Sequence, residues 1–412
     1  MAADRIPEGF QQTEVGVIPG DWDCLPISEI FDFKQGIQCP VENQYKIDRP
    51  DLKRFIRIVD LTQKDEPARY ILDPGSSHHV DRDDLFMVRY GSPGLLGYGY
   101  KGVIANNLFR LVPKKKLVNQ FYLHLLTQKR SEIIGVSGSS TMPAINFSTL
   151  RTLYLIAPSI AEQTAIAAAL SDMDALIESL ERLIGKKQAM KQGAMQELLT
   201  GKRRLAGFGA GKGMRRTEVG VVPGDWEVTT LANCCSLSKK RINPQSSEEV
   251  YKCVELEHIS SETGRLIDIS DTKNLKSLKA VFQKGDTLFG KLRPYLRKYL
   301  FAEFDGVCST EIWVLKPNER IHDKWLYYVI QTDRIIDAAN QSEGTKMPRA
   351  DWALVSSTTI PLPQTLAEQR AIARTLSDMD AEIGQLEAQL AKYRRVKEGM
   401  MQELLTGKKR LV

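Results

Sequence analysis

A short basic stretch in the second half of the 412-residue chain carries side chains suited to bind a polyanion. It reads GKLRPYLRKY from Gly290 to Tyr299 and places cations and aromatic rings around a proline. Guanidinium and ammonium groups bind phosphates and guanine edges, and tyrosines add apolar and hydrogen-bonding contacts. The stretch therefore suits a loop that faces DNA, and a solvated basic edge of a strand is the alternative. The candidate residues are Lys291, Arg293, Tyr295, Arg297 and Lys298.

The first half carries a counterpart, RYGSPGLLGYGYKG, at residues 89–102. It is less basic but rich in glycine and tyrosine, so it is either a DNA contact or a glycine-rich hairpin that only turns the chain. Its candidate residues are Arg89, Tyr98, Tyr100 and Lys101. A run of three lysines at 114–116 indicates a solvated surface instead.

Two loops, one late in each half, add hydroxyl groups and cations. These side chains suit phosphate contact, although the same residues equally suit structural turns. The candidates are Ser140 and Thr141, beside Ser139, in the first half, and Lys346 and Arg349, beside Thr345, in the second. Nothing in these stretches identifies the bases that such loops would contact.

Sequence motifs for catalysis are missing. The chain has no (N/D)PP(F/Y) tetrapeptide, no PD…(D/E)xK cluster and no HExxH, and its one Asn-Pro pair, Asn243-Pro244, is followed by glutamine. The glycine-rich stretch 201–216 fits neither GxxxxGK[ST] nor GxGxxG and indicates a flexible basic linker. Six cysteines without a CxxC pair favour reduced, mostly buried thiols over a zinc site. No catalytic, cofactor-binding or metal-ligating residue is predicted.

Composition sets loose limits on the class of protein. With 42% hydrophobic and 26% charged residues the chain resembles an ordinary soluble protein, and its net charge of +6 permits a polyanionic partner without requiring one. The N-terminus lacks the apolar core of a signal peptide, and no stretch approaches the roughly 18 apolar residues of a membrane span. We expect a cytoplasmic protein that does not enter a membrane.

The chain is an internal duplication. Residues 161–205 and 367–411 align without a gap, with roughly three positions in five identical, and TEVGVIPGDW at 13–22 returns as TEVGVVPGDW at 217–226. Each half is therefore a short lead-in segment, a block of its own sequence and a long conserved stretch. Trp22 and Trp226, each after a Pro-Gly turn, are predicted to anchor the lead-in segment on its block.

The conserved stretches have the heptad period of a coiled coil. Capping boxes at Ser159/Glu162 and Thr365/Glu368 begin them, and Gly201 ends the first as Gly407 ends the second. Each predicts one helix of roughly 40 residues, about 60 Å long. The predicted seam consists of Ile166, Leu170, Met173, Ile177, Leu180, Ile184, Ile372, Leu376, Met379, Ile383, Leu386 and Leu390.

Each predicted helix is acidic in its first half and basic in its second. An antiparallel arrangement places acidic halves against basic halves, so we expect an intramolecular antiparallel pair, with two separate amphipathic helices as the alternative. Gly193 and Gly399 occupy the same point in both helices, where they predict a close helix crossing or a kink.

The two blocks share an outline. The first has strand-like runs at 54–62, 83–91 and 107–113 and a helix-like run at 119–135; the second has strand-like runs at 251–260, 284–292 and 311–317 and a helix-like run at 323–339. The predicted segments are a lead-in (1–23), a first block (24–158), a long helix (159–203), a linker with repeated lead-in (204–227), a second block (228–364) and a second long helix (365–412).

The motifs TEVGVIPGDW, EQxAIAxxLSDMDAxI and MQELLTGKxRL, with GTKMPRADW at 344–352, resemble those of DNA-specificity subunits of type I restriction-modification systems. The resemblance covers essentially the whole chain. It implies an α+β protein with two mixed α/β target recognition domains joined by an intramolecular antiparallel coiled coil, with half-chain duplication about a pseudo-twofold axis. In that family each block reads one half of a bipartite DNA target, and the helices set the spacer between the halves.

The resemblance also implies partners. Two modification (methyltransferase) subunits dock on the conserved regions of such proteins, and restriction subunits with motor and nuclease activity can join the assembly. The chain itself is then non-catalytic, with S-adenosylmethionine bound by the methyltransferase subunit. Two other hypotheses remain open: a coiled-coil scaffold with two protein-binding domains and no role on DNA, and a nuclease or methyltransferase in its own right.

Overall fold

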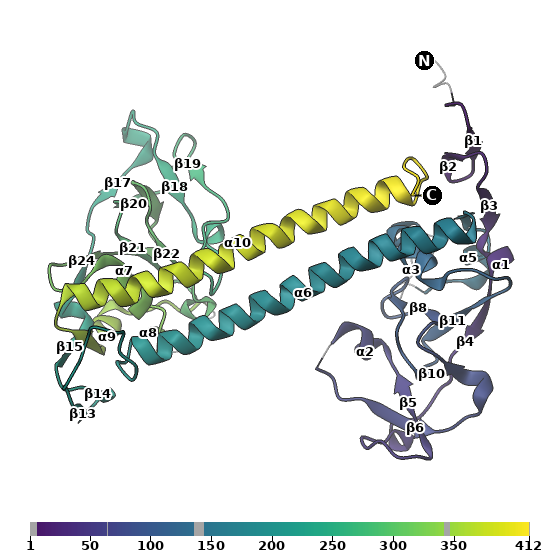
Figure 1. Ribbon diagram of the computed structural model, residues 1–412. Helices are drawn as coiled ribbons and strands as arrows, with labels where there is room; N and C mark the ends of the chain where they lie inside the picture. The colour runs from purple at the N-terminus through teal and green to yellow at the C-terminus, as the bar shows by residue number, and fades with distance from the viewer. Residues whose placement is uncertain (1–5, 64, 136–143, 342–346, 412) are drawn as a thin grey trace. The chain divides into compact units, whose positions relative to one another are not determined.

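The computed structural model describes residues 6–63, 65–135, 144–341 and 347–411 (Figure 1). The chain forms two compact units, one made of residues 1–181 with 388–412 and the other of residues 182–387. Each unit therefore contains one block together with parts of both long helices.

The block of the first unit contains two four-stranded sheets, in the orders β4-β11-β8-β9 and β6-β5-β10-β7. All strand pairs are antiparallel except β10 with β5. The strands are β4 (Phe31–Gln35), β5 (Leu52–Ile56), β6 (Arg69–Leu72), β7 (His79–Val80), β8 (Leu85–Val88), β9 (Leu96–Gly97), β10 (Gly102–Ile104) and β11 (Leu108–Pro113). The helices are α1 (Ile27–Ile30), α2 (Ile58–Thr62), α3 (Asn119–Gln128), α4 (Arg130–Gly135) and α5 (Phe147–Leu150), with 3₁₀ turns η1 (Val41–Asn43) and η2 (Ser76–His78).

The block of the second unit repeats this topology with one additional strand. Its sheets have the orders β16-β24-β21-β22 and β17-β20-β23-β18-β19, and β18 with β23 is again the parallel pair. The strands are β16 (Cys235–Leu237), β17 (Arg241–Ile242), β18 (Lys252–Val254), β19 (Ser270–Asp271), β20 (Lys279–Phe282), β21 (Thr287–Gly290), β22 (Tyr299–Phe301), β23 (Gly306–Ser309) and β24 (Ile312–Pro317). The helices are α7 (Asp323–Val329), α8 (Asp333–Ala339) and α9 (Trp352–Ser357), with 3₁₀ turns η3 (Leu231–Asn233), η4 (Pro244–Ser246), η5 (Leu256–His258) and η6 (Pro294–Leu296).

Four predicted elements of the blocks are wrong in part. The strand-like run at 251–260 is strand β18 followed by the 3₁₀ turn η5. The run at 54–62 is strand β5 followed by helix α2, because Asp60 accepts the backbone N–H of Arg57 at 2.9 Å and begins a helical turn. Both helix-like runs are broken in two, at Lys129 and between Val329 and Asp333, where Thr332 caps a new helix.

The lead-in segments form hairpins and attach each block to a long helix. The hairpins are β1 (Phe10–Thr13) with β2 (Gly16–Pro19) and β13 (Met214–Thr217) with β14 (Gly220–Pro223); the strand pairs after them are β3 (Asp23–Pro26) with β12 (Tyr154–Ala157) and β15 (Trp226–Thr230) with β25 (Thr359–Pro363). Trp22 and Trp226 are each 1% exposed, which confirms them as anchors. Their indole N–H groups donate to Glu162 (2.9 Å) and Glu368 (3.3 Å).

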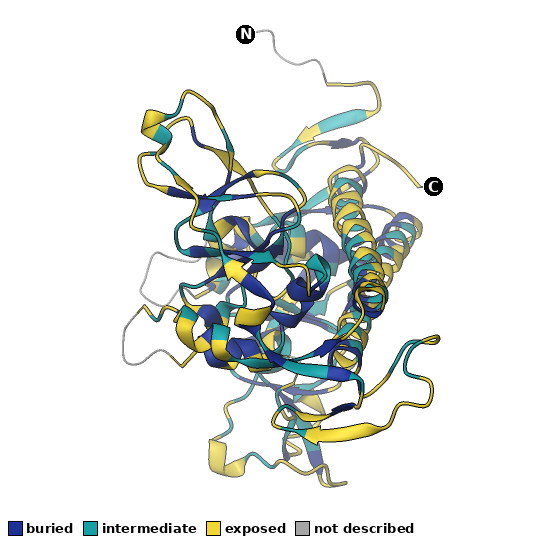
Figure 2. Cartoon of the chain, turned by 90° about the vertical axis from the view of Figure 1, so that its left-hand side faces the viewer, coloured by how far each residue is buried: buried dark blue, intermediate teal, exposed yellow. Residues whose placement is uncertain are grey.

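The two long helices are α6 (Ile160–Leu198) and α10 (Leu366–Leu404), each of 39 residues, as predicted. In the first unit Lys397 pairs with Asp174 at 2.5 Å and Arg394 with Glu181 at 2.7 Å; in the second unit Lys187 pairs with Glu382 at 2.5 Å. In these pairs, positions later in one helix meet positions earlier in the other, so the antiparallel prediction is confirmed. Exposed and buried residues alternate along both helices (Figure 2).

The predicted seam is only partly a helix-to-helix seam. Leu180, Ile184, Ile383 and Leu390 are at most 8% exposed, whereas Met173, Ile177, Met379 and Leu386 are half-buried. The four residues nearest the helix starts are fully buried but belong to the cores of the blocks, because each helix begins against its own sheet and short helices; these are Ile166, Leu170, Ile372 and Leu376.

Two predictions about the helix ends and interiors need correction. Ser159 and Thr365 do accept the N–H of Glu162 and Glu368 at 3.3 Å, but the glutamate side chains bind tryptophan and arginine instead of closing a capping box. Gly193 and Gly399 mark no close crossing, because a Cβ at either position would meet nothing within 4 Å, and both helices run through them without a break.

An arginine after each long helix fixes a lead-in segment: Arg410 the first one and Arg204 the second. In the first unit Arg410 donates to Asp21 at 2.9 and 3.0 Å and to Glu162 at 2.8 Å. The hydrogen bond from Arg410 also holds the pKa of Asp21 below its usual value. In the second unit Arg204 makes the same contacts with Asp225 and Glu368. The repeated TGKxRL ending therefore has a structural role in both units.

Candidate nucleic-acid interface

The basic stretch of the second block forms the loop between β21 and β22. Arg293 (φ 52°) and Arg297 (φ 49°) flank the 3₁₀ turn η6 and are both left-handed. The third non-glycine residue with positive φ among those described, Glu262 (φ 64°), donates its N–H to the carbonyl of Arg297 at 3.0 Å. Such conformations cost about 1–3 kcal/mol each and persist only where the surroundings impose them, often at binding sites. The loop is therefore a rigid, strained feature.

The structure divides the predicted residues of this loop into two groups. Arg297 binds Asp333 and the carbonyl of Gln331, and Lys298 donates to the carbonyl of Leu256 at 2.6 Å. The side chains of the other three residues make no ion pair or hydrogen bond with the described part of the chain; these residues are Lys291, Arg293 and Tyr295. Tyr295 is 53% exposed. Among the described contacts of this loop, none occupies the side chains of this second group, which leaves them available to a ligand.

Residues 347–350 support the base of this loop. Pro348 accepts the N–H of Arg293 at 2.8 Å, and Ala350 donates to the carbonyl of Lys291 at 2.8 Å. Arg349 forms a two-point contact with Glu311 at 3.0 and 3.2 Å, so this predicted residue is occupied by the chain itself. Lys346, with Thr345, lies outside the described residues.

The first block builds the same frame from different residues. The backbone N–H of Arg89 donates to the carbonyl of Asn107, and the carbonyl of Arg89 accepts from the N–H of Ile145. In the second block the backbone of Lys291 makes the same two hydrogen bonds, with Glu311 and Ala350. The equivalent loop joins β8 to β9 and takes its turns at glycines with positive φ. The two loops are therefore equivalent in position and different in surface chemistry.

The predicted residues of the first block are mostly engaged. Arg89 donates to Gln35 at 3.2 Å and lies 4.6 Å from the centre of the Phe147 ring. The hydroxyl group of Tyr100 donates to the carbonyl of Asp60 at 3.0 Å, and burial raises its pKa.

Tyr98 and Lys101 have acidic partners. The Tyr98 hydroxyl is 3.4 Å from Asp83, and Lys101 pairs with Asp81 at 3.1 Å, where both side chains are more than 70% exposed. The Lys101 pair is weak because water screens it, so this lysine remains available to a stronger anion. Ser140 and Thr141, with Ser139, lie outside the described residues.

The second block has a second basic segment that was not among the predicted site residues. Lys239 and Lys240 lie between β16 and β17, Arg241 begins β17, and all three are exposed. Their adjacency was visible in the sequence, but only the strand order brings them to the end of the sheet from which the β21–β22 loop emerges.

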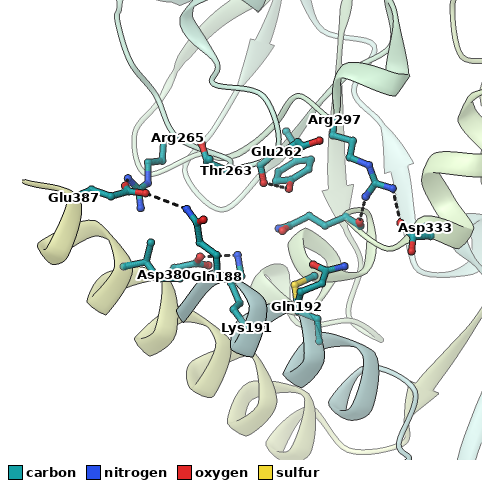
Figure 3. Close-up of a pocket in the computed structure, with 14 residues that line it drawn as sticks. Gln188, Lys191, Gln192, Glu262, Thr263, Arg265, Arg297, Asp333, Asp380 and Glu387 are labelled. Carbon is teal, nitrogen blue, oxygen red and sulfur yellow. Dashed lines mark hydrogen bonds and ion pairs between the residues drawn. The ribbon is translucent and has the colours of Figure 1, made fainter. Parts of the chain in front are cut away.

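A polar pocket of about 470 Å³ lies within the second unit, between the β21–β22 loop base and the long helices (Figure 3). Every cation among its lining residues has an acidic partner: Lys191 pairs with Asp380 at 2.6 Å, Arg265 with Glu387, and Arg297 with Asp333. The pocket therefore braces the block on the helices and offers no unpaired cation to a polyanion. Among the described residues, no group of His, Cys, Asp or Glu could hold a metal ion, and no helix is long and apolar enough to cross a membrane.

The sequence matches the family model described as type I restriction modification DNA specificity domain twice, over residues 19–187 and 223–392. It is 23% identical to the type I restriction enzyme MjaVIII specificity subunit of Methanocaldococcus jannaschii, covering 98% of this chain and 96% of the relative. It is 26% identical to the type I restriction enzyme EcoDI specificity subunit of Escherichia coli, covering 66% of each.

Solved structures show the same fold. The S subunit of a type I restriction-modification system from M. genitalium has a TM-score of 0.60 at 16% identity, covering 93% of this chain and 96% of that one. A chain from a study of type I R-M complex assembly and conformational transition has a TM-score of 0.51 at 14% identity, covering 95% and 99%. With two matches to the family model spanning most of its length, this chain belongs to the type I restriction modification DNA specificity family.

Proposed function

We propose that this chain is the DNA-reading, non-catalytic subunit of a type I restriction-modification complex. Each block reads one half of a bipartite sequence, α6 and α10 set the spacing between the halves and carry two methyltransferase subunits, and restriction subunits join the assembly. S-adenosylmethionine and the methyl-transfer chemistry belong to the methyltransferase subunits.

The observation that carries the proposal is the pair of equivalent loops on one repeated frame. Both blocks hold the loop after β8 or β21 by the same backbone hydrogen bonds, while the side chains at its surface differ. In the second block the loop presents Lys291, Arg293 and Tyr295, which suit phosphates and base edges in a major groove. A constant frame with variable loops is what two readers of different half-sites need.

The repeated helices support the part of the proposal that concerns methyltransferase docking. The residues that fix each helix to its block recur in both units, with Trp22, Glu162 and Arg410 in one and Trp226, Glu368 and Arg204 in the other. Two equivalent helix surfaces suit two copies of one partner.

The test is the methylome of a host that carries this chain with its methyltransferase. We expect a bipartite methylated motif, and replacing residues 228–364 by the block of a relative should change only one half of it. Replacing residues 24–158 should change only the other half. A host without a bipartite motif that depends on this chain would leave the scaffold hypothesis as the better one.

A further inference from the structure

Two basic segments of the second block emerge at one end of the sheet β16-β24-β21-β22. Ser238, just after β16, donates its N–H to Val314 at 2.8 Å, and Gly290, the last residue of β21, pairs with Ile312. Both contacts are to the first half of β24, which lies between β16 and β21. Strands lie about 4.8 Å apart, so the two segments begin about 10 Å from each other.

The cations on these segments have no partners in the described part of the chain. No side-chain ion pair or hydrogen bond with the described residues is made by the cations of either segment, which are Lys239, Lys240 and Arg241 in one and Lys291 and Arg293 in the other. The carboxylate of Glu311, whose backbone carbonyl binds the Lys291 N–H, is already held by Arg349. Like charges that gather without a counterion repel one another, and binding of a polyanion relieves that repulsion.

The first block shows a less charged version of this surface. Leu111 pairs with Phe33 in the first block as Leu315 pairs with Leu237 in the second. Gln35 lies two residues after Phe33, and Lys239 lies two residues after Leu237, so Gln35 and Lys239 occupy equivalent positions. Arg89 and Lys291 are equivalent because they make the same backbone hydrogen bonds.

The exchange at these two positions changes the charge of the surface. Gln35 accepts a hydrogen bond from Arg89 at 3.2 Å. The second block therefore has two lysines where the first has a bonded amide and guanidinium.

Aromatic side chains pack beside the basic segment formed by Lys239, Lys240 and Arg241. A hollow of about 660 Å³ is lined by Ser236, Ser238, Lys239, Arg241 and Trp352, among others. The ring of Trp352 lies edge-on to Trp313 at 5.4 Å, which in turn stacks on Phe289 at 5.8 Å. The surface beside the β16–β17 segment is thus supported by packed aromatic rings.

We infer that Lys239, Lys240 and Arg241 form a second phosphate-binding track, so that the second block contacts both phosphate strands that border one groove. The separation of about 10 Å is close to the width of the major groove, about 12 Å. The β21–β22 loop lies on one side of this groove and the β16–β17 segment on the other. The inference rests on the proposed function and adds an asymmetry: the second block supplies more of the electrostatic attraction for DNA than the first.

The test is the salt dependence of DNA binding by the full chain assembled with its methyltransferase subunits. The probes are a duplex with the motif found in the methylome and one with both halves scrambled. The variant Lys239→Gln/Lys240→Gln/Arg241→Gln should lower the slope of log K against log[salt] by about 2.7, because each phosphate contact contributes about 0.9. Between 50 and 200 mM salt the wild type should then lose about 40-fold more affinity than the variant. The preference for the motif should stay within about threefold, because phosphate contacts carry no sequence information.

The matched control is Lys114→Gln/Lys115→Gln/Lys116→Gln, which removes the same charge from the first block. These lysines follow β11, whose last residue pairs with Phe31 at the sheet end opposite Arg89. The control should change the slope by less than about 1. Neutral methylphosphonate linkages placed only on the strand that faces the β16–β17 segment should weaken binding by the wild type and the control, and have little effect on the β16–β17 variant.

The possible outcomes separate the two proposals. A wild-type complex that does not distinguish the two duplexes contradicts the proposed function. A wild type that does distinguish them, together with a β16–β17 variant whose slope equals that of the control, overturns the phosphate track alone. If the triple variant fails to fold, as judged by its thermal unfolding, Lys239→Gln and Arg241→Gln are measured singly, each with an expected fall in slope of about 0.9.

Discussion

The contact of Arg410 with Glu162 gives the sharpest stability prediction for the fold. The Glu162 side chain is 2% exposed and receives hydrogen bonds from the Trp22 indole and from the Arg410 guanidinium. In Arg410→Met the carboxylate keeps only the indole N–H and remains buried. The first unit should therefore become much less stable, while the second unit, which has its own Arg204, should not change.

The size of the effect follows from the burial of the carboxylate. Removing one partner of a buried ion pair costs about 3–5 kcal/mol, and the lower end applies here because the Arg410 side chain is 35% exposed and water can replace part of it. We therefore expect about 3 kcal/mol, equivalent to an opening equilibrium about 150-fold larger. Adding Glu162→Gln removes the unpaired charge, so the double variant should lose only about 1 kcal/mol.

Hydrogen exchange of the native protein measures this separately in each unit, because amides open with local free energies. Peptides from β4, β8 and β11 should lose protection by about 150-fold in Arg410→Met, and peptides from β16, β21 and β24 should not. Arg204→Met should give the mirror result. A loss below about tenfold, or a double variant as unstable as Arg410→Met, would refute the argument from the buried carboxylate.

Two further predictions concern single residues. Burial lowers the pKa of His124 from 6.5 to about 4, although the charge of Asp174 acts in the opposite direction. Because the native state keeps this imidazole neutral, the free energy of unfolding of the first unit should fall by about 3 kcal/mol as pH falls from 6.5 to 4. Denaturation measured at several pH values should show this dependence in the wild type and not in His124→Gln. Gly201→Ala should destabilise the second unit by about 2 kcal/mol in urea unfolding, because Gly201 has φ +71° and a Cβ there would meet Pro223 at 2.4 Å. Gly193→Ala, by contrast, should stabilise its helix by about 1 kcal/mol.

The repeated helices and anchors were predictable because their signals are local. Heptad spacing, charge asymmetry and a tryptophan after each Pro-Gly turn require no knowledge of what lies far along the chain, whereas the contacts of these tryptophans with Glu162, Glu368, Arg204 and Arg410 are seen only in the fold. The helix starts at Ile166 and Ile372 were harder, because the same apolar period serves a coiled-coil seam and the core of a block, and only the tertiary structure assigns it.

The candidate interface was predictable only as a segment. The sequence shows that residues 290–299 are basic, but it does not show that Arg297 forms an ion pair with Asp333 while Arg293 remains exposed. That difference depends on where α8 lies beside η6. Similarly, Lys239 and Lys291 are far apart in sequence, and their proximity is a property of strand order.

The left-handed residues at Arg293 and Arg297 also have a thermodynamic consequence. Ordering the backbone of a flexible residue costs about 1–2 kcal/mol in conformational entropy. The five residues from Arg293 to Arg297 are already ordered by η6 and by Pro348, so most of that cost falls on folding and little on association. A loop that cannot refold also cannot adapt to a wrong half-site, so discrimination between sites should appear mainly in the rate at which DNA dissociates.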